Sequence, residues 1–525
     1  MKNTTTYRLL LFIFVGVTIF AFFRYAYPYH LLHKEQLLLF TYSAEQLSGY
    51  LSKPAFLSCL AGDFLTQFLH FRGPGAVVVT VLLTALGGLT YTAARKWCNA
   101  GKAIIPAILI LIGEAFRLCD IIYPLSGTIA LIGGLSLFLF TGLLKGKWSF
   151  AIASVCGILV SYWLFGYGML VFALLSLLTA ITRNGNYAAA SLLLAGSVAT
   201  PYVLSGHYLL TPSQAYTYPA TTGWSFPDFE NERMLGMNTE DYLANWGKVL
   251  ELSHPDLHTG MFSVSYNLAN AMQGELADRL MNYYQPAGLG LFMPINEESN
   301  YLSTQLAGEV WFQLGDMTMA EHATLLSMIF SPQHRGVRAV QRLAEINLIN
   351  GDEAAAMKYL RLLSQTLTYK KWAEERIPGK ESESVKKWLR EKQGLLPLQD
   401  TIRTSTTDIA KSLHLLLDAN PNNRIARDYL LCFHLLMKDL PSFMKDYKQY
   451  CRAKPGRLYA EALLIQLYKE QATGKEIQDT GMAPDVVQAF NEYNYIHTQS
   501  KGNPNALTGK FGKSYWFYYH FVQFQ

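Results

Sequence analysis

From Met1 to about Tyr208 the chain consists of long apolar runs that few charged side chains interrupt. The hydrocarbon core of a bilayer takes about 20 mainly apolar residues per helix, with roughly 17–25 tolerated. Seven stretches have this character, and they cover residues 8–27, 75–94, 103–119, 126–144, 149–165, 167–183 and 187–206. We therefore predict that residues 1–210 form an all-α, polytopic bundle of about seven transmembrane helices in contact with membrane lipid.

From about Asp228 onward the charge density is that of a soluble domain. A length of 525 residues favours two or three domains. Only 16% of all residues are charged, against about 25% in soluble globular proteins, because the apolar half lowers the average. The formal net charge of +5 is small for this length, so we expect no nucleic-acid partner.

The first apolar run begins like a signal peptide, since Lys2 and Arg8 precede it. The stretch "VTIFAFFRYAYPYH" at its end has no small-residue cleavage site, and more apolar segments follow, so we interpret it as a retained membrane anchor. If the spans alternate, one side of the membrane holds most of the basic loop residues, namely Lys2, Arg8, Arg95, Lys96, Lys102, Lys145, Lys147 and Arg183. Basic loops mark the cytoplasmic side.

An odd number of spans then places the C-terminal half outside the cytoplasm, which in a bacterial inner membrane is the periplasm. The fifth and sixth spans decide this outcome. They fill the short interval between Lys147 and Arg183 and must meet at "LFGYG" with almost no loop. A single span there would place the C-terminal half in the cytoplasm, and the sequence leaves both possibilities open.

The C-terminal half contains a sequence repeat. Residues 308–332 read "GEVWFQLGDMTMAEHATLLSMIFSP", and residues 342–363 read "RLAEINLINGDEAAAMKYLRLL". A Gly-Asp pair at Gly315 and again at Gly351 separates two helical apolar patterns in each. Glycine reverses the chain there, so each stretch predicts two antiparallel helices.

These stretches resemble the tetratricopeptide (TPR) repeat, a helix–turn–helix unit of about 34 residues. Small residues stand where its two helices would touch, namely Gly308 with Ala320 and then Ala344 with Ala356. The first unit also has the aromatic Trp311 and the closing proline Pro332, whereas the second has Asn347 and no proline.

The resemblance is clearest over residues 301–370 and weaker at 266–284 and before Pro455. It implies a TPR-like α-solenoid over residues 255–525, preceded by a juxtamembrane linker and first helix at 211–254. The charged segment 377–407 is expected to be an inserted loop or short helix.

Stacked helical hairpins present a concave surface that commonly binds peptides or proteins. We therefore expect a protein or peptide partner, the alternative being an array that only packs on the membrane bundle. Cys432 and Cys451 could form a disulfide in an oxidising compartment or remain buried thiols. Neither a CxxC pair nor an HExxH spacing is present, and no metal site is expected.

Ionisable residues in the apolar half are candidates for function, because they are costly in a membrane unless paired or functional. The stretch "GEAFRLCD" places Glu114, Arg117 and Asp120 along one helix face near the outer boundary. Either these three charged side chains neutralise one another where the helix ends, or they form part of a functional site. In the first external loop, Glu35 follows the membrane exit, and a break at Lys53-Pro54 divides residues of about 41–70 into two amphipathic, interfacial helices.

This layout resembles the GT-C glycosyltransferases, which use polyprenyl-phosphate-linked sugars. Their seven-span module has two juxtamembrane helices and an early acidic residue in the first external loop, and some members carry TPR repeats. The resemblance implies that Glu35 is the catalytic base, Glu114 or Asp120 a second acid, and Arg117 or Arg24 a ligand of the lipid phosphate. The chain has "KEQ" where that family usually has adjacent acids.

The alternative function is a non-catalytic, membrane-anchored TPR scaffold that recruits partners in cell-envelope biogenesis. The layout also resembles an uncharacterised bacterial multi-pass family, which would add no activity. In an enzyme, the Glu35 carboxylate should face a groove shared with Glu114 or Asp120. In a scaffold, it should face water or lipid headgroups.

The topology is testable with a tag fused after Gln525. In intact spheroplasts, external protease should remove the tag, because an odd number of spans places the C-terminus outside the cytoplasm. A cytoplasmic control protein should remain intact. A tag that resists protease until the membrane is broken would contradict the predicted orientation.

Overall fold

The computed structural model describes residues 2–220, 225–254, 259–331, 334–398, 408–451 and 454–523. Within these ranges every regular element is a helix and no strand occurs. The all-α prediction is therefore confirmed. The closing proline Pro332 and the end of the predicted insertion, residues 399–407, lie outside the described residues.

The chain divides into two compact units. The first comprises Met1–Glu232 together with two short later stretches, Arg335–Arg338 and Arg361–Glu374, which we call the returning segments. The second comprises Arg233–His334, Ala339–Leu360 and Glu375–Gln525. The boundary after Glu232 falls inside the predicted linker at 211–254.

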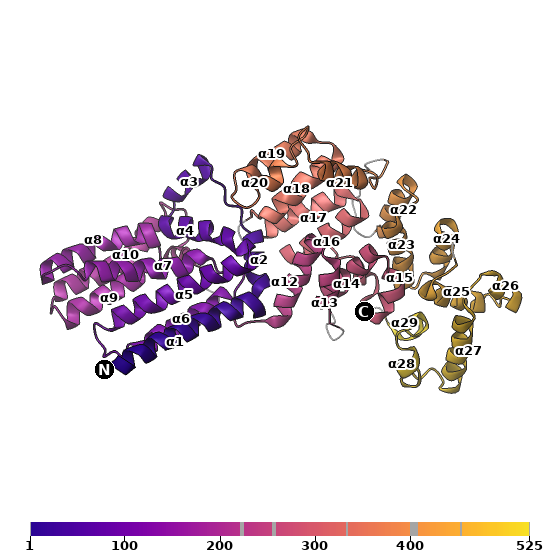
Figure 1. Cartoon of the computed structure of the whole chain (residues 1–525), viewed down its shortest axis with the longest axis horizontal. Helices are drawn as coiled ribbons and strands as arrows, with labels where there is room; N and C mark the ends of the chain where they lie inside the picture. The colour runs from indigo at the N-terminus through magenta and orange to yellow at the C-terminus, as the bar shows by residue number, and fades with distance from the viewer. Residues whose placement is uncertain are drawn as a thin grey trace. The chain divides into compact units, whose positions relative to one another are not determined.

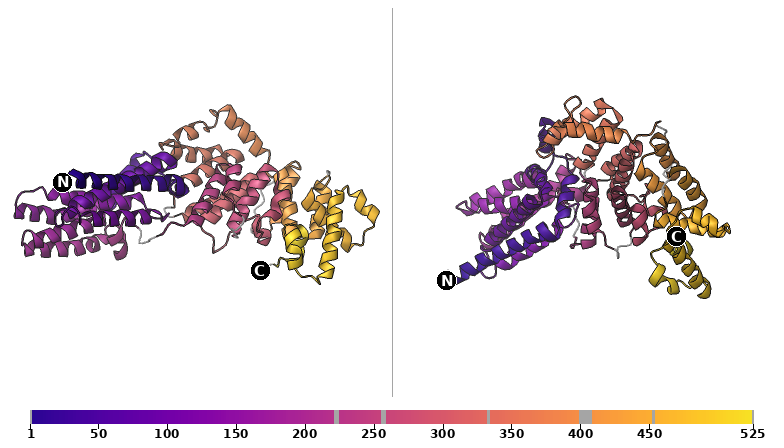
Figure 2. Two further views of the ribbon diagram at one scale, coloured as in Figure 1. Left: turned by 60° about the horizontal axis from the view of Figure 1, so that its bottom comes forward. Right: turned by 45° about the vertical axis from the view of Figure 1, so that its right-hand side comes forward.

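The first unit is built on a bundle of apolar helices that lie side by side (Figures 1 and 2). These are α1 (Lys2–Ala21), α5 (Arg72–Ala94), α6 (Ile104–Leu118), α7 (Leu125–Thr141), α8 (Lys147–Phe165), α9 (Gly168–Thr182) and α10 (Tyr187–Ser205). Each predicted span coincides with one of these helices.

Three of the described helices, α5, α8 and α10, are long and apolar enough to cross a membrane. A fourth span results if Leu10–Ala26 and Pro28–Gln36, which meet at a 72° bend, count as one. Helices α7 and α9 are apolar but shorter. The bundle thus contains a few helices able to span a membrane, and the predicted number of seven spans is not confirmed.

The fifth and sixth predicted spans are two separate helices. Helix α8 ends at Phe165, and α9 begins at Gly168. Between them, Gly166 adopts a φ of +54°, and a Cβ atom there would lie 2.3 Å from the carbonyl oxygen of Tyr218. Only glycine fits this turn, because a side chain would collide with the neighbouring backbone.

Helices α7 and α9 approach each other through glycine. A Cβ atom on Gly134 would lie 2.1 Å from the carbonyl oxygen of Gly168, and one on Gly168 would lie 2.0 Å from that of Ala130. Small residues allow the backbones of two apolar helices to come this close. The short separation increases the dispersion attraction between the helices.

Shorter helices complete the first unit: η1 (Phe22–Ala26), α2 (Pro28–Gln36), α3 (Ala44–Leu51), α4 (Phe56–Thr66), η2 (Gln67–His70), α11 (Pro212–Thr217) and α20 (Lys370–Glu374). Helices α3 and α4 fall within the region predicted for two interfacial helices. The break between them is at the expected position, because Pro54 disfavours a helical backbone in the residue before it.

The second unit begins within α12 (Phe229–Tyr242) and contains short helices before the first predicted repeat: α13 (Trp246–Leu252), α14 (Gly260–Gln273), α15 (Leu276–Arg279), η3 (Leu280–Asn282) and η4 (Ala287–Gly290). The two predicted repeats are α16 (Tyr301–Leu314) with α17 (Met317–Phe330), and α18 (Val337–Asn350) with α19 (Glu353–Ser364). The last residues of α19 and the first of α18 belong to the returning segments.

The remaining helices follow as a succession of neighbours (Figure 1). They are α21 (Glu383–Gln393), α22 (Ile409–Ala419), α23 (Arg424–Leu436), α24 (Leu440–Tyr450), α25 (Arg457–Lys469), α26 (Gly474–Asp479), α27 (Pro484–Gln499), α28 (Asn505–Phe511) and α29 (Tyr515–Phe521). The expected insertion thus contains the helix α21. Cys432 and Cys451 are free thiols.

Both predicted Gly-Asp turns are present. Gly315 and Gly351 have φ angles of +101° and +80°, and each is followed by an aspartate that accepts a hydrogen bond from the first turn of the next helix. A Cβ atom on Gly308 would touch that of Ala323 at 3.5 Å, so α16 and α17 meet through small residues as expected.

The glycine contact between α7 and α9 can be tested with Gly168→Ala. The added methyl group overlaps the Ala130 carbonyl and must push the helices apart, so we expect a loss of about 1–3 kcal/mol in folded-state stability. Urea-dependent proteolysis of the purified protein measures it. The matched control is Gly88→Ala in α5, where no atom lies within 4 Å, and it should leave stability equal or slightly higher.

Candidate functional site

Helix α2 carries the candidate base Glu35. Pro28 starts the helix, because its fixed φ suits a first turn and it has no N–H to leave unpaired. The next two backbone N–H groups, of Tyr29 and His30, donate to the carboxylate of Glu232 at 2.6 and 2.9 Å. Glu232 therefore caps the positive end of α2, where a negative charge is favoured.

Lys34 in α2 contacts the end of α6. Its Nζ donates to the carbonyl oxygens of Leu118 and Tyr123 at 2.9 and 2.8 Å. These groups are at and just beyond the C-terminal end of α6, where a cation is stabilised by the unpaired carbonyls. Lys34 is buried, so its side-chain nitrogen needs acceptors such as these two carbonyl oxygens.

Glu35, the next residue, contacts a returning segment. The hydroxyl of Tyr369 lies 2.8 and 2.7 Å from the two carboxylate oxygens of Glu35. It donates a hydrogen bond to this carboxylate. His70 Nδ1 lies 3.1 Å from the Tyr369 hydroxyl and 3.5 Å from Glu35 Oε2. Only 3% of Glu35 is exposed, so Tyr369 and His70 enclose the carboxylate.

The space beside Glu35 is small. Its walls include Glu35 and Tyr369 with Phe40, Gln67 and Val337, and the cavity volume is about 10 Å³. That is room for about one water molecule. A sugar or a lipid phosphate does not fit there.

Glu114 lies in α6 within a separate polar cluster. Its Oε1 accepts hydrogen bonds from Tyr123 at 2.5 Å and Thr128 at 2.7 Å. Arg117, one turn along, lies 3.8 Å from Oε2 and over the ring of Tyr123. The Tyr123 hydroxyl is also 3.3 Å from that of Tyr167.

The other two candidate residues, Asp120 and Arg24, have further contacts of their own. Asp120 is half-buried after the end of α6, and its Oδ1 accepts the backbone N–H of Ile122 at 3.0 Å. Arg24 lies over the ring of Tyr25, with its guanidinium 5.3 Å from the ring centre.

The structure therefore gives Glu35 and Glu114 two different sets of hydrogen-bond partners. Glu35 is enclosed by Tyr369 and His70, whereas Glu114 is enclosed by Tyr123 and Thr128. Arg117 is with Glu114, as its spacing indicates. The described contacts do not join the two carboxylates in a common groove.

A further buried carboxylate, in α4, also contacts a returning segment. Asp63 in α4 accepts a hydrogen bond from the Tyr50 hydroxyl at 2.6 Å, and Arg335 Nη2 lies 3.4 Å away. Burial raises the pKa of Asp63, while Tyr50 and Arg335 oppose that rise. The backbone of Tyr42 also donates to the Gln365 carbonyl at 2.8 Å.

No pattern in the sequence marks Tyr369 or Arg335 as partners of these acids. Both lie in charged stretches without a motif, and Tyr369 is 334 positions from Glu35.

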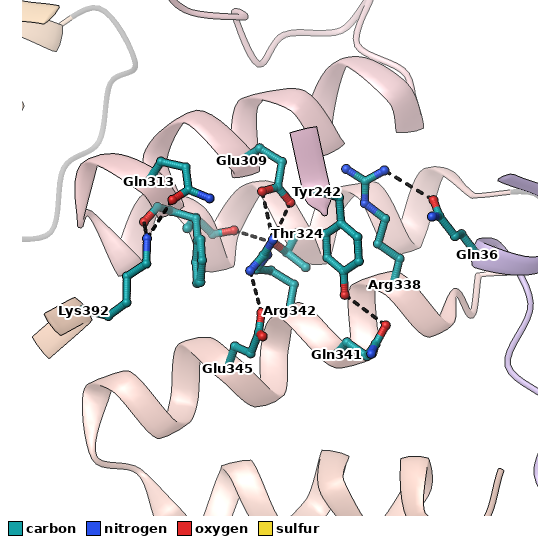
Figure 3. Close-up of polar contacts among 12 residues, drawn as sticks. Gln36, Tyr242, Glu309, Gln313, Thr324, Arg338, Gln341, Arg342, Glu345 and Lys392 are labelled. Carbon is teal, nitrogen blue, oxygen red and sulfur yellow. Dashed lines mark hydrogen bonds and ion pairs between the residues drawn. The ribbon is translucent and has the colours of Figure 1, made fainter. Parts of the chain in front are cut away.

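The second unit has its own buried charge cluster, on the first helices of the two predicted repeats (Figure 3). Arg342 Nη2 donates to both oxygens of Glu309 at 2.8 and 2.9 Å, and its Nη1 donates to Glu345 at 2.5 Å. Burial by itself lowers the pKa of Arg342, but the two carboxylates outweigh it and raise the pKa. This ion pair connects α16 with α18.

Aromatic rings surround the same guanidinium. The Arg342 Cζ atom lies 3.7 Å from the ring centre of Phe312 and 4.8 Å from that of Tyr242. Lys392 extends toward the other end of the cluster and donates to Gln313 at 2.8 Å (Figure 3). Burial lowers the pKa of Lys392, and the positive charge of Arg342 lowers it further, to about 8. The cluster is closely packed, as expected for a structural contact between repeats.

Among the described residues, no group of three or more His, Cys, Asp or Glu side chains is arranged to hold a metal ion. The acids of the first unit instead act as hydrogen-bond acceptors for hydroxyl and backbone N–H groups.

A family described as a family of unknown function (DUF6057) matches residues 2–522 of the chain. No curated protein and no solved structure matches the chain.

The enclosure of Glu35 can be tested with Tyr369→Phe, which removes the hydroxyl donor but keeps the ring. The buried carboxylate loses its main donor, so we expect the first unit to lose about 1–3 kcal/mol of stability. Proteolysis at increasing urea measures the loss. Combining Tyr369→Phe with Glu35→Leu should recover part of it, because both polar partners are then absent. Equal stability of Tyr369→Phe and wild type would contradict the described contact.

Proposed function

The chain belongs to DUF6057, a family of unknown function, and on that premise we propose that it is a non-catalytic, membrane-anchored helical scaffold. In this proposal the first unit holds the protein in the membrane and the second unit recruits a protein or peptide partner in cell-envelope biogenesis. The observation that carries the proposal is the enclosure of Glu35 by Tyr369 and His70.

A catalytic base must reach the proton that it removes, through at most one water molecule. Glu35 is instead held by a tyrosine from a returning segment, beside a cavity that holds about one water. Glu114 is enclosed by its own hydroxyl donors. These contacts support stabilising roles for both acids, because a buried carboxylate needs donors whatever else it does.

The proposal includes the membrane arrangement expected from the sequence. All seven apolar helices of the bundle would cross the bilayer, with the N-terminus in the cytoplasm and the second unit in the periplasm. Helix α9 has only 15 residues. A helix this short spans a bilayer only where the bilayer is locally thin, so that the polar interface lies close to both helix ends. The separation of α8 from α9 supports the odd number of spans on which this orientation depends.

The helical hairpins of the second unit support the recruiting role. Helix α16 turns into α17 through Gly315, and the buried Arg342 ion pair connects this hairpin to the next. Such arrays bury their apolar faces by stacking and leave a long surface for partners. We propose that these hairpins form a TPR-like array.

A second candidate function is the GT-C-like transfer of a sugar from a polyprenyl-phosphate donor. The observation that favours it is the position of Glu35 after the first apolar helix, in contact with two groups that can exchange protons, His70 and Tyr369. For this reaction the returning segments would have to move away from Glu35, and the acceptor hydroxyl would lose its proton to that carboxylate as the sugar transfers.

The two functions are distinguished by Glu35→Gln, which keeps an oxygen acceptor for Tyr369 but removes the base. In a cell that lacks the native protein and shows an envelope defect, we expect this variant to restore the phenotype as well as wild type does, at equal membrane abundance. Loss of a catalytic base typically costs about 10²–10⁴-fold in rate. A glycosyltransferase would therefore fail this test.

The matched comparison is Glu114→Gln, whose carboxylate has hydroxyl donors of its own. A scaffold should tolerate both variants wherever they remain folded. If Glu35→Gln abolishes function while its abundance and urea resistance equal those of wild type, the scaffold proposal is wrong and the enzyme reading takes its place.

A further inference from the structure

A large, mainly apolar cavity lies within the second unit. Its volume is about 760 Å³, which is within the range of small-molecule binding sites. The irregular segment at residues 284–294 forms one wall. The other walls come from Trp311 in α16, Ile409 in α22, Phe433 and Met437 at the end of α23, and Val522 after α29.

The side chains around this cavity are mostly apolar. Among the described residues that form its walls there is no Asp, Glu, Lys, Arg or His. Phe292 packs against Trp311 and Phe433 with ring centres 4.9 and 6.2 Å apart, and this aromatic group makes a rigid floor. Met293 and Met437 add flexible thioether side chains that adapt to the shape of a ligand.

The polar side chain of Gln285 is already used within the protein. Its Oε1 accepts from Asn267 at 2.8 Å, and its Nε2 donates to the Leu280 carbonyl at 2.8 Å. The remaining polar side chains at the cavity, Tyr284 and Gln523, are both exposed.

Several backbone carbonyls at and next to the wall are also occupied. Those of Pro286 and Gly288 accept from N–H groups three residues later, both at 3.2 Å. Side chains donate to the carbonyls of Tyr284, Gly290, Pro294 and Val522. Pro286 and Pro294 have no N–H to offer. The wall thus provides mainly apolar area, and several of its polar groups are already paired within the protein.

We propose that this cavity binds the hydrocarbon chain of a lipid. A peptide would bring one N–H and one C=O per residue against a mainly apolar wall, and every group left unpaired there lowers its affinity. A hydrocarbon chain has no polar groups to satisfy and gains from every contact. Its headgroup remains in water beside Tyr284 and Gln523.

This binding would depend on chain length. Each buried methylene contributes about 0.8 kcal/mol, which corresponds to about a fourfold increase in affinity per methylene. The increase should continue until the chain fills the cavity and then stop. Because no charged side chain lines the cavity, a fatty alcohol should bind about as tightly as the fatty acid of equal length. The inference does not depend on whether the first unit is catalytic.

The test uses the full chain in lipid nanodiscs and a fatty acid with a diazirine in mid-chain. After irradiation and digestion, we expect labelled peptides from residues 284–294 and from the end of α23. Unlabelled fatty acids should compete with the labelled one for the cavity. Their affinity should rise about fourfold with each added methylene until the chain fills the cavity. Labelling that spreads over exposed apolar helices without competition would overturn the proposal.

Leu289→Asp places a carboxylate in the wall of the cavity and should reduce the labelling at least tenfold. The matched control is Leu243→Asp, outside the cavity, because the two leucines are 51% and 55% exposed in the free protein. The control should be labelled as strongly as wild type. Equal labelling of the two variants would exclude this cavity as the site.

Met293→Trp provides a second measurement that keeps the wall apolar. The larger side chain shortens the cavity, so competition should stop increasing at a shorter chain length than in wild type. An unchanged length limit would contradict the proposal. Stronger competition by an apolar peptide than by any fatty acid would overturn it in favour of peptide binding.

Discussion

A buried carboxylate requires hydrogen-bond donors around it, since removing its charge from water costs several kcal/mol that only close partners can offset. This requirement organises the first unit. Glu232 is satisfied by the start of α2, Glu35 by Tyr369, and Glu114 by Tyr123 and Thr128. Glu232 and Glu35 thereby connect elements that are distant in sequence, and Glu114 connects α6 to the start of the neighbouring α7. The same residues that suggest an active site in the sequence are the ones that hold its elements together.

The second unit uses the same physical principle with a cation at the centre. Arg342 is buried between Glu309 and Glu345, with aromatic rings against its guanidinium. An ion pair of this kind adds little net stability compared with an apolar contact, but losing one partner is expensive. It therefore favours one way of stacking successive hairpins over others. Apolar packing elsewhere in this unit provides most of the stability.

Much of the fold is predictable from the sequence because local rules determine it. Apolar runs of suitable length became helices, Gly315 and Gly351 became turns, and the break at Gly166 separated α8 from α9. The candidate site was less predictable. Helical spacing correctly placed Arg117 near Glu114, because residues three apart share a face.

Helical spacing could not show that Thr128 faces Glu114, since that depends on the rotation of α7 against α6. Nor could it show that Tyr369 returns to Glu35, because no pattern marks a contact across such a sequence separation. Residues that meet only through the tertiary fold leave no periodic signal in a single sequence. For the same reason the apolar cavity of the second unit, whose walls come from three helices and two irregular segments, was not foreseen.

The returning segments also impose an order on biosynthesis. Glu35 leaves the ribosome early, and its donor Tyr369 follows 334 positions later. At ordinary translation speeds of about 5–20 residues per second, that delay is on the order of tens of seconds. During this time the apolar helices have already emerged, while the acid at their boundary still lacks its tyrosine and relies on water. The first unit is thus completed only by a stretch translated long after its helical bundle.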